Sequence, residues 1–152
     1  MKKVNTNNFK KTLSKFSTGI TVVCVKNNNS IYGKTVNSFN SLSLNPPMVL
    51  FSLGNYSSSI KKFSKTNFLS INILSSKQKK LSDNFASTRP KLENIKFIEG
   101  KYKTAIIPNC IANLECKLID KIKKGDHIIF ISKILEVQSN DKLKPLVYFN
   151  SK

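Results

Sequence analysis

Two short pieces of the sequence carry the side chains that could do chemistry. Residues 33–47 concentrate small hydroxyl and amide side chains between two apolar runs, and the piece begins at Gly33. Such a stretch can offer backbone N–H groups and short polar side chains to a flat, phosphate-bearing ligand, and glycine permits its close approach. The second piece, residues 125–127, is Gly-Asp-His and holds the only histidine, His127. We expect the two pieces to meet at one site.

Residue types and spacing exclude several other kinds of site. The five glycines form neither G-x-G-x-x-G nor a Walker loop, so a Rossmann dinucleotide site and a P-loop are not expected. No C-x-x-C pair accompanies His127, and no metal site is expected. Cys116 falls on the apolar phase of a predicted strand, which favours a buried thiol. No serine lies in a G-x-S-x-G elbow, and the eight carboxylates show no catalytic pair by spacing.

The formal charge of +18 invites a nucleic-acid interpretation, but the type of the basic residues argues against it. Of 26 basic residues only Arg89 is arginine, the side chain that base and phosphate recognition favours. The lysines are spread along the chain and interleaved with asparagines, as AT-rich coding DNA would produce. No specific nucleic-acid partner is therefore expected, while non-specific attraction to polyanions stays open.

The 152 residues are expected to form one domain, residues 1–152, with a sizeable core. No apolar run of about 18 residues exists, so a spanning helix and membrane contact are not expected. The basic amino terminus lacks the apolar stretch of a secretory signal. Three cysteines without framework spacing indicate reduced thiols, and hence a cytoplasmic protein.

The apolar pattern predicts short strands and a few short helices. A first helix is expected from Thr6, with Phe9, Leu13 and Phe16 on one face, and is expected to end at Gly19. By the same patterns we expect strands at 20–25, from 31 onward, and at 48–53, 67–74, 112–119, 127–137 and 146–149, with helices from Ser57 to Phe63 and after Ser76.

Two of these strands are predicted to form a hairpin. In the strand expected at 112–119, apolar residues at 112, 114, 116 and 118 alternate with polar residues at 113, 115 and 117, which places Glu115 on the exposed face of a half-buried strand. Residues 123–126 are a turn signal, and a long apolar strand follows from His127. About six strands, mostly joined by short turns, predict a small antiparallel barrel.

Taken in order, the motifs resemble the flavin reductase-like, FMN-binding split-barrel family, which includes the reductase components of two-component flavin monooxygenases. The matching pieces are residues 16–23 (FSTGITVV), 33–39 (GKTVNSF), 41–44, 46–47, 68–74 (FLSINIL), 85–86, 114–116, 125–127 (GDH) and 145–148 (PLVY). The resemblance implies a mainly β fold, a six-stranded antiparallel split β-barrel with a few short flanking helices. Val36 departs from the family, in which alanine is usual, and no aromatic residue follows Ser151.

The resemblance implies an NAD(P)H-dependent flavin reductase and a homodimer. Such an enzyme binds FMN or FAD, transfers hydride from NADH or NADPH to the flavin, and supplies reduced flavin to a partner monooxygenase. No catalytic side chain is expected, because hydride passes between bound cofactors. His127 and Tyr148 are expected at the nicotinamide dinucleotide. The residues expected at the flavin are Lys34, Thr35, Val36, Asn37, Ser38, Ser52, Leu53, Ser57, Ser58, Lys62, Phe85 and Ala86.

A second hypothesis remains open, a flavin-binding or basic polyanion-binding split-barrel protein without reductase activity. Each signal also has an ordinary structural explanation: a polar loop at 33–43, a helix cap at Ser57, a core residue at Phe85 and a turn-flanking histidine at His127. The sequence does not choose between FMN and FAD, or between NADH and NADPH.

Overall fold

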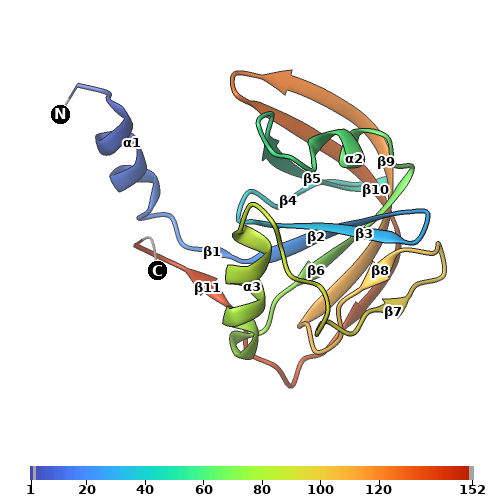
Figure 1. The fold of residues 1–152 in the computed structure, drawn as a ribbon. Helices are drawn as coiled ribbons and strands as arrows, with labels where there is room; N and C mark the ends of the chain where they lie inside the picture. The colour runs from blue at the N-terminus through green and yellow to red at the C-terminus, as the bar shows by residue number, and fades with distance from the viewer. Residues whose placement is uncertain (2, 151–152) are drawn as a thin grey trace.

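Apolar runs, β-branched in β2 (Thr21–Asn27), form the main strands in the computed structural model, which describes residues 1 and 3–150. Seven antiparallel strands make one curled sheet (Figure 1), in the order β3-β2-β6-β9-β10-β5-β4. In that order the strands are β3 (Ser30–Val36), β2 (Thr21–Asn27), β6 (Phe68–Ile73), β9 (Ala112–Lys124), β10 (His127–Ser139), β5 (Pro47–Gly54) and β4 (Asn40–Leu44).

Smaller elements flank this sheet. Strand β1 (Thr18–Gly19) pairs with β11 (Val147–Tyr148), and β7 (Ile98–Glu99) pairs with β8 (Ala105–Ile106). The helices are α1 (Thr6–Leu13), α2 (Ile60–Ser64), the 3-10 turn η1 (Ser76–Gln78) and α3 (Lys79–Ala86). The predicted fold class, a mainly β antiparallel split barrel with short helices, is confirmed. Among the described residues the main sheet has seven strands rather than the six expected.

The additional strand lies inside the polar segment, where a single strand and loop were predicted. Strand β3 ends at Val36, the chain bends, and β4 then pairs with β5, Asn40 opposite Leu50. The Ser38 hydroxyl fixes this bend, because Oγ accepts from the Ser52 amide at 3.0 Å and donates to the Ser52 carbonyl at 3.1 Å. A side chain thus replaces ladder hydrogen bonds at the bend.

Two apolar clusters form the core on the two faces of β2. Inside the barrel, the Phe51 and Phe130 rings stack with centroids 5.1 Å apart, and Phe63 packs on them edge-on. The second cluster joins β2 to α3 and includes Cys24 and Phe85. Burial on both faces explains why residues 21–25 are continuously buried. Each large apolar side chain so buried contributes about 1.5–3 kcal/mol.

The predicted hairpin is confirmed and is longer than expected. Strands β9 and β10 pair from His127 opposite Lys124 to Ser139 opposite Ala112. The turn between them uses Gly125 at φ +56°, a conformation that glycine adopts without steric cost.

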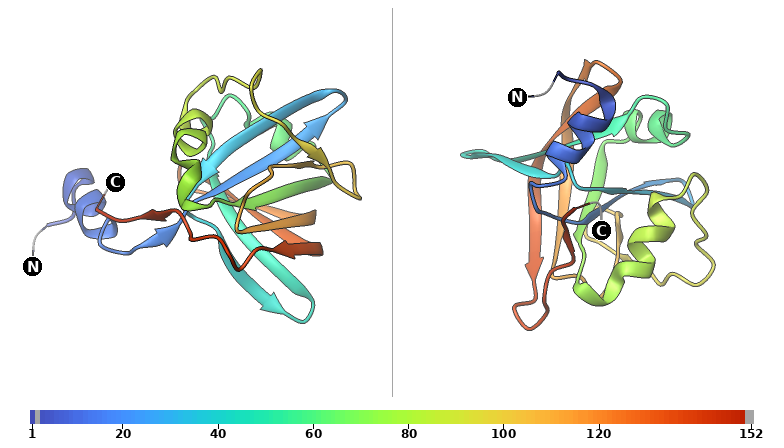
Figure 2. Two further views of the ribbon diagram at one scale, coloured as in Figure 1. Left: turned by 90° about the horizontal axis from the view of Figure 1, so that it is seen from below. Right: turned by 90° about the vertical axis from the view of Figure 1, so that its left-hand side faces the viewer.

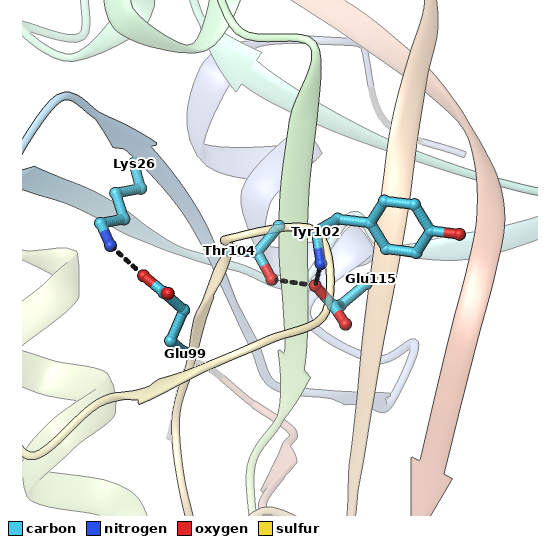
Figure 3. A network of polar contacts seen from close by, with 5 residues as sticks. All are labelled: Lys26, Glu99, Tyr102, Thr104 and Glu115. Atoms are coloured by element: carbon cyan, nitrogen blue, oxygen red, sulfur yellow. Dashed lines mark hydrogen bonds and ion pairs between the residues drawn. The ribbon is translucent and has the colours of Figure 1, made fainter.

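The prediction that Glu115 lies on the exposed face of β9 is wrong. The residue is buried, with 6% of its surface exposed. Its carboxylate accepts hydrogen bonds from the Lys101 and Tyr102 amides, both at 2.9 Å, and from Thr104 Oγ1 at 2.7 Å. Figure 3 shows two of these contacts, from Tyr102 and Thr104, with the Lys26–Glu99 ion pair nearby. Three donors offset the desolvation of the charge and hold the β7–β8 loop against β9.

Helix α1 differs from its prediction at both ends. The N-cap is Asn5, whose side chain accepts from the Asn8 amide at 2.9 Å, rather than Thr6. The helix ends at Leu13 and does not reach Gly19, because Gly19 belongs to β1 and is held extended against β11. The helix stands apart from the barrel in Figures 1 and 2. In the described part of the chain, no helix has the length and apolar character needed to span a membrane.

The three cysteines are buried and unpaired with one another. The prediction of a buried Cys116 thiol is confirmed, and its burial raises its pKa to about 12. Burial likewise raises the pKa of Cys110 to about 11 and that of Cys24 well above its ordinary value. These thiols are therefore poor nucleophiles and serve as packing groups.

Candidate functional site

A cavity of about 360 Å³ opens where the ends of β3, β5 and β10 meet the loop before α2 and the end of α3. Its volume is within the range of small-molecule and cofactor sites. The two sequence pieces meet here as expected. The lining residues are Lys34, Thr35, Val36, Asn37, Ser38, Ser52, Leu53, Gly54, Tyr56, Ser57, Ser58, Ala86, Thr88 and His127.

Strand register brings His127 to this cavity. As the first residue of β10, His127 lies opposite Gly54, the last residue of β5, so the β9–β10 turn comes to the cavity mouth. The Asn55 amide donates to the Asp126 carbonyl at 2.9 Å and fastens the turn to β5. The ring atom Nδ1 lies 2.7 Å from Asp126 Oδ1, and 44% of the His127 side chain is exposed. The histidine is therefore oriented by its neighbour and open to a ligand.

The pairing has an electrostatic consequence for Asp126. Its hydrogen bond with the His127 ring, together with the charge of that ring, lowers the pKa of the Asp126 carboxyl. Asp126 therefore remains ionised near neutral pH and can hold the imidazole in one orientation.

The polar residues of β3 bind α3 and the segment after it with their side chains. Thr35 Oγ1 donates to the Ser82 carbonyl at 2.7 Å, and Lys34 Nζ donates to the Ser87 carbonyl at 2.7 Å. Burial lowers the pKa of the Lys34 ammonium. Because these donors are already used within the protein, the side chains of this strand shape the cavity wall. What they leave for a ligand is chiefly the remaining acceptor capacity of the hydroxyl and the flanking backbone.

Among the described residues that line the cavity, Ser57 alone has a buried side-chain oxygen without a hydrogen-bond partner. Its Oγ is buried, and none of the described residues forms a hydrogen bond with it. Ser58 Oγ donates to the Thr88 carbonyl at 3.4 Å, at the outer limit of a hydrogen bond. A buried hydroxyl without a partner costs about 1–3 kcal/mol, which a ligand oxygen at this place would offset. An anionic oxygen, such as that of a phosphate, fits this part of the cavity.

The predicted helix start at Ser57 is corrected. Helix α2 begins at Ile60 with Ser59 as its N-cap. The Ile60 amide donates to the Ser57 carbonyl three residues back, which closes a separate turn before the helix. Ser57 and Ser58 therefore face the cavity from a turn. The phosphate site expected there would not be formed by the amide groups of a regular helix end.

Three predicted residues lie outside this cavity. Phe85 is fully buried against Gly33, where an added Cβ would lie 2.4 Å from the Phe85 ring, so it supports β3 from the core. Lys62 places its Nζ 5.1 Å from the centre of the Tyr32 ring. Tyr148 lines an adjoining cavity that shares part of its wall, residues 35–37 and Ala86, with the first.

The lining residues that the sequence did not indicate are Gly54, Tyr56 and Thr88. Gly54 continues the strand of Ser52 and Leu53, and an added Cβ there would lie 2.7 Å from the Tyr56 ring. The strand-ending Gly-Asn-Tyr was the available signal for Gly54 and Tyr56. No carboxylate is among the lining residues, whereas Lys34 and His127 are, which suits an anionic ligand.

Comparison with known proteins agrees with this geometry. The model of the flavin reductase like domain matches residues 13–152. SmoA of Agrobacterium fabrum, an FMN reductase (NADH), is 33% identical over 137 residues, which cover 90% of this chain and 79% of the relative. The reductase component of 4-hydroxyphenylacetate 3-monooxygenase from Thermus thermophilus is 33% identical over 141 residues, covering 93% of this chain and 90% of the relative.

The fold comparison gives the same answer. The solved structure of the flavin reductase PheA2 in its native state matches with a TM-score of 0.92 at 32% identity, covering 98% of this chain and 96% of that one. The chain belongs to the flavin reductase like family.

Proposed function

We propose that this protein is an NAD(P)H:flavin oxidoreductase, with its flavin in the cavity at the ends of β3, β5 and β10. The observation that carries the proposal is the buried, unpartnered Ser57 hydroxyl in a carboxylate-free cavity lined by the polar segment of β3. The named activities of SmoA and PheA2 support the same assignment. The flavin is FMN or FAD, and the co-substrate is NADH or NADPH.

The residues around the cavity bind and orient their ligands and do not transfer protons. A bound flavin supplies the acceptor for the hydride of the reduced nicotinamide. Ser57 and Ser58 provide hydroxyls for the phosphate, and the end of β3 provides a wall for the ring. His127, at the open side, positions the nicotinamide dinucleotide.

A partner monooxygenase receives the reduced flavin in this proposal. Support comes from the Thermus thermophilus relative, which is named as the reductase component of a monooxygenase. The cavity has an open mouth, with His127 half exposed, so product flavin can leave. The three unpaired thiols are consistent with a cytoplasmic protein, which we also propose.

We also propose that the protein is a homodimer, and helix α1 supports this. Its apolar side chains remain exposed: Phe9 at 57%, Leu13 at 53% and the following Phe16 at 73%. On edge strand β4, Leu44 is 93% exposed. Apolar surfaces of this kind on one chain favour burial against a second copy. Light scattering at micromolar concentration and physiological salt tests the proposal, and a monomer there contradicts it.

Steady-state oxidation of NADH with and without added FMN or FAD tests the activity. The expected result is NADH oxidation that depends on flavin. Flavin binding without NADH oxidation would instead favour a passive flavin-binding protein. Failure to bind either flavin would contradict the proposed function as a whole.

A further inference from the structure

A further cavity, distinct from the one that Tyr148 lines and called the second cavity below, adjoins the proposed flavin cavity across a thin wall. It has a volume of about 330 Å³, close to the 360 Å³ of the first. Ser58 and Thr88 line both cavities. The two residues are joined by the long hydrogen bond, 3.4 Å, from Ser58 Oγ to the Thr88 carbonyl. A ligand that passes over this wall would nearly double the space it occupies.

The second cavity offers the groups that a nucleotide needs. Arg89, the only arginine of the chain, lines it, and a guanidinium can bind two phosphate oxygens at once. Tyr32 lines it as well and provides an aromatic ring against which a purine can pack. Lys62, 5.1 Å from the centre of that ring, adds positive charge. No carboxylate is among the lining residues of either cavity.

We infer that the second cavity binds the adenylyl half of FAD, so that the protein selects FAD over FMN. The phosphate nearest the riboflavin lies at Ser57 and Ser58, the second phosphate at Arg89, and the adenosine against Tyr32. This inference rests on the proposed function, because it requires a flavin in the first cavity. FMN ends at its single phosphate and gains nothing from Arg89.

Separate titrations with FMN and with FAD, in the absence of any nicotinamide, test the inference. The proteins are the wild type, Arg89→Gln and a matched control, Lys91→Gln. Lys91 is exposed, carries the same charge and lines neither cavity. Quenching of flavin fluorescence gives both dissociation constants, and thermal unfolding checks that the variants are folded.

The wild type is expected to bind FAD about tenfold more tightly than FMN, because one additional charge-assisted hydrogen bond increases affinity by about this factor. Arg89→Gln is expected to lose this preference and leave FMN affinity within about twofold, while Lys91→Gln keeps it. Equal affinities in the wild type would overturn the inference. An equal loss for both flavins in Arg89→Gln would also overturn it, because Arg89 would then bind the phosphate that both share.

Two further outcomes separate this inference from the proposed function. If Arg89→Gln raises the KM for NADH while FAD affinity stays intact, the second cavity serves the nicotinamide dinucleotide and the inference is overturned. If the wild type binds neither flavin, the proposed function fails, and the inference fails with it.

Discussion

Two buried polar sites in this protein differ in whether their hydrogen bonds are complete. At the β7–β8 loop, the Glu115 carboxylate accepts from two backbone amides and one hydroxyl. At the cavity, the Ser57 hydroxyl oxygen is also buried and has no partner among the described residues. The charged group, which is the costlier to bury, is satisfied, and the neutral one is not.

The contrast distinguishes a polar group that holds the fold from one that serves a ligand. A network that is complete without ligand stabilises the protein as it stands. An incomplete one lowers stability until something binds, and this is characteristic of functional sites. The two sites should therefore respond in opposite ways to substitution.

The largest effect is expected at Glu115. Glu115→Ala leaves three donors without their acceptor, so the free energy of unfolding should fall by about 3 kcal/mol. Urea denaturation measures this loss, and flavin affinity of the folded protein should not change. Glu115→Gln, which keeps one carbonyl acceptor, is the control and should lose less. A neutral Glu115→Ala would show that the loop does not depend on this network.

Ser57 and Ser58 should show the opposite behaviour. Replacing both by Ala should weaken flavin binding by about 1–3 kcal/mol, because hydrogen bonds to a charged group are lost. Stability without flavin should stay the same or rise, since the unpartnered hydroxyl is removed. Fluorescence titration and urea denaturation on the same preparation measure both. Unchanged affinity would place the phosphate elsewhere.

His127 is neither a buried polar group with complete hydrogen bonds nor a buried one without a partner, because its ring contacts its neighbour Asp126 and is half exposed. If it positions the dinucleotide, His127→Ala should raise the KM for NADH or lower kcat/KM by roughly tenfold to a hundredfold. Flavin affinity should stay nearly unchanged. Normal kinetics with a slightly less stable protein would make His127 a turn residue and nothing more.

The smallest effect is expected at Thr35, a cavity hydroxyl that already has a partner. Thr35→Val removes the 2.7 Å hydrogen bond to the Ser82 carbonyl and should cost about 1 kcal/mol of stability. Flavin affinity should change far less than in the Ser57 and Ser58 variant. A larger loss of affinity than of stability would mean that Thr35 contacts the flavin with its side chain.

The structural features that the sequence predicted correctly depend on residues that are close together in the chain. The β-branched run of β2, the Gly125 turn and the strand from His127 all follow from local pattern, and they were found. The strand pairing that brings His127 to Gly54 gives the predicted meeting of the two pieces its physical basis. Roles of individual residues at a flavin remain predictions.

What the sequence did not predict depends on distant contacts. Glu115 follows the alternation of an exposed residue, and its burial depends on donors from the Lys101–Thr104 loop. The separation of β4 from β3 depends on the Ser38 hydroxyl reaching Ser52. Helix α1 has the pattern of a packed helix, but its apolar face stays exposed in the single chain. A local sequence pattern does not reveal these contacts, because the residues that make them are far apart in the chain.

The cavity wall is contributed by β3, the end of β5, the end of α3 and the first residue of β10, which are far apart in the sequence. No fragment of the chain can therefore form it, and the wall exists only when the long-range pairing of β5 with β10 is complete. A ligand bound there recognises the whole fold and not the unfolded chain. Flavin should therefore raise the unfolding midpoint in proportion to the logarithm of its concentration, and should be released in the same cooperative step in which the barrel opens.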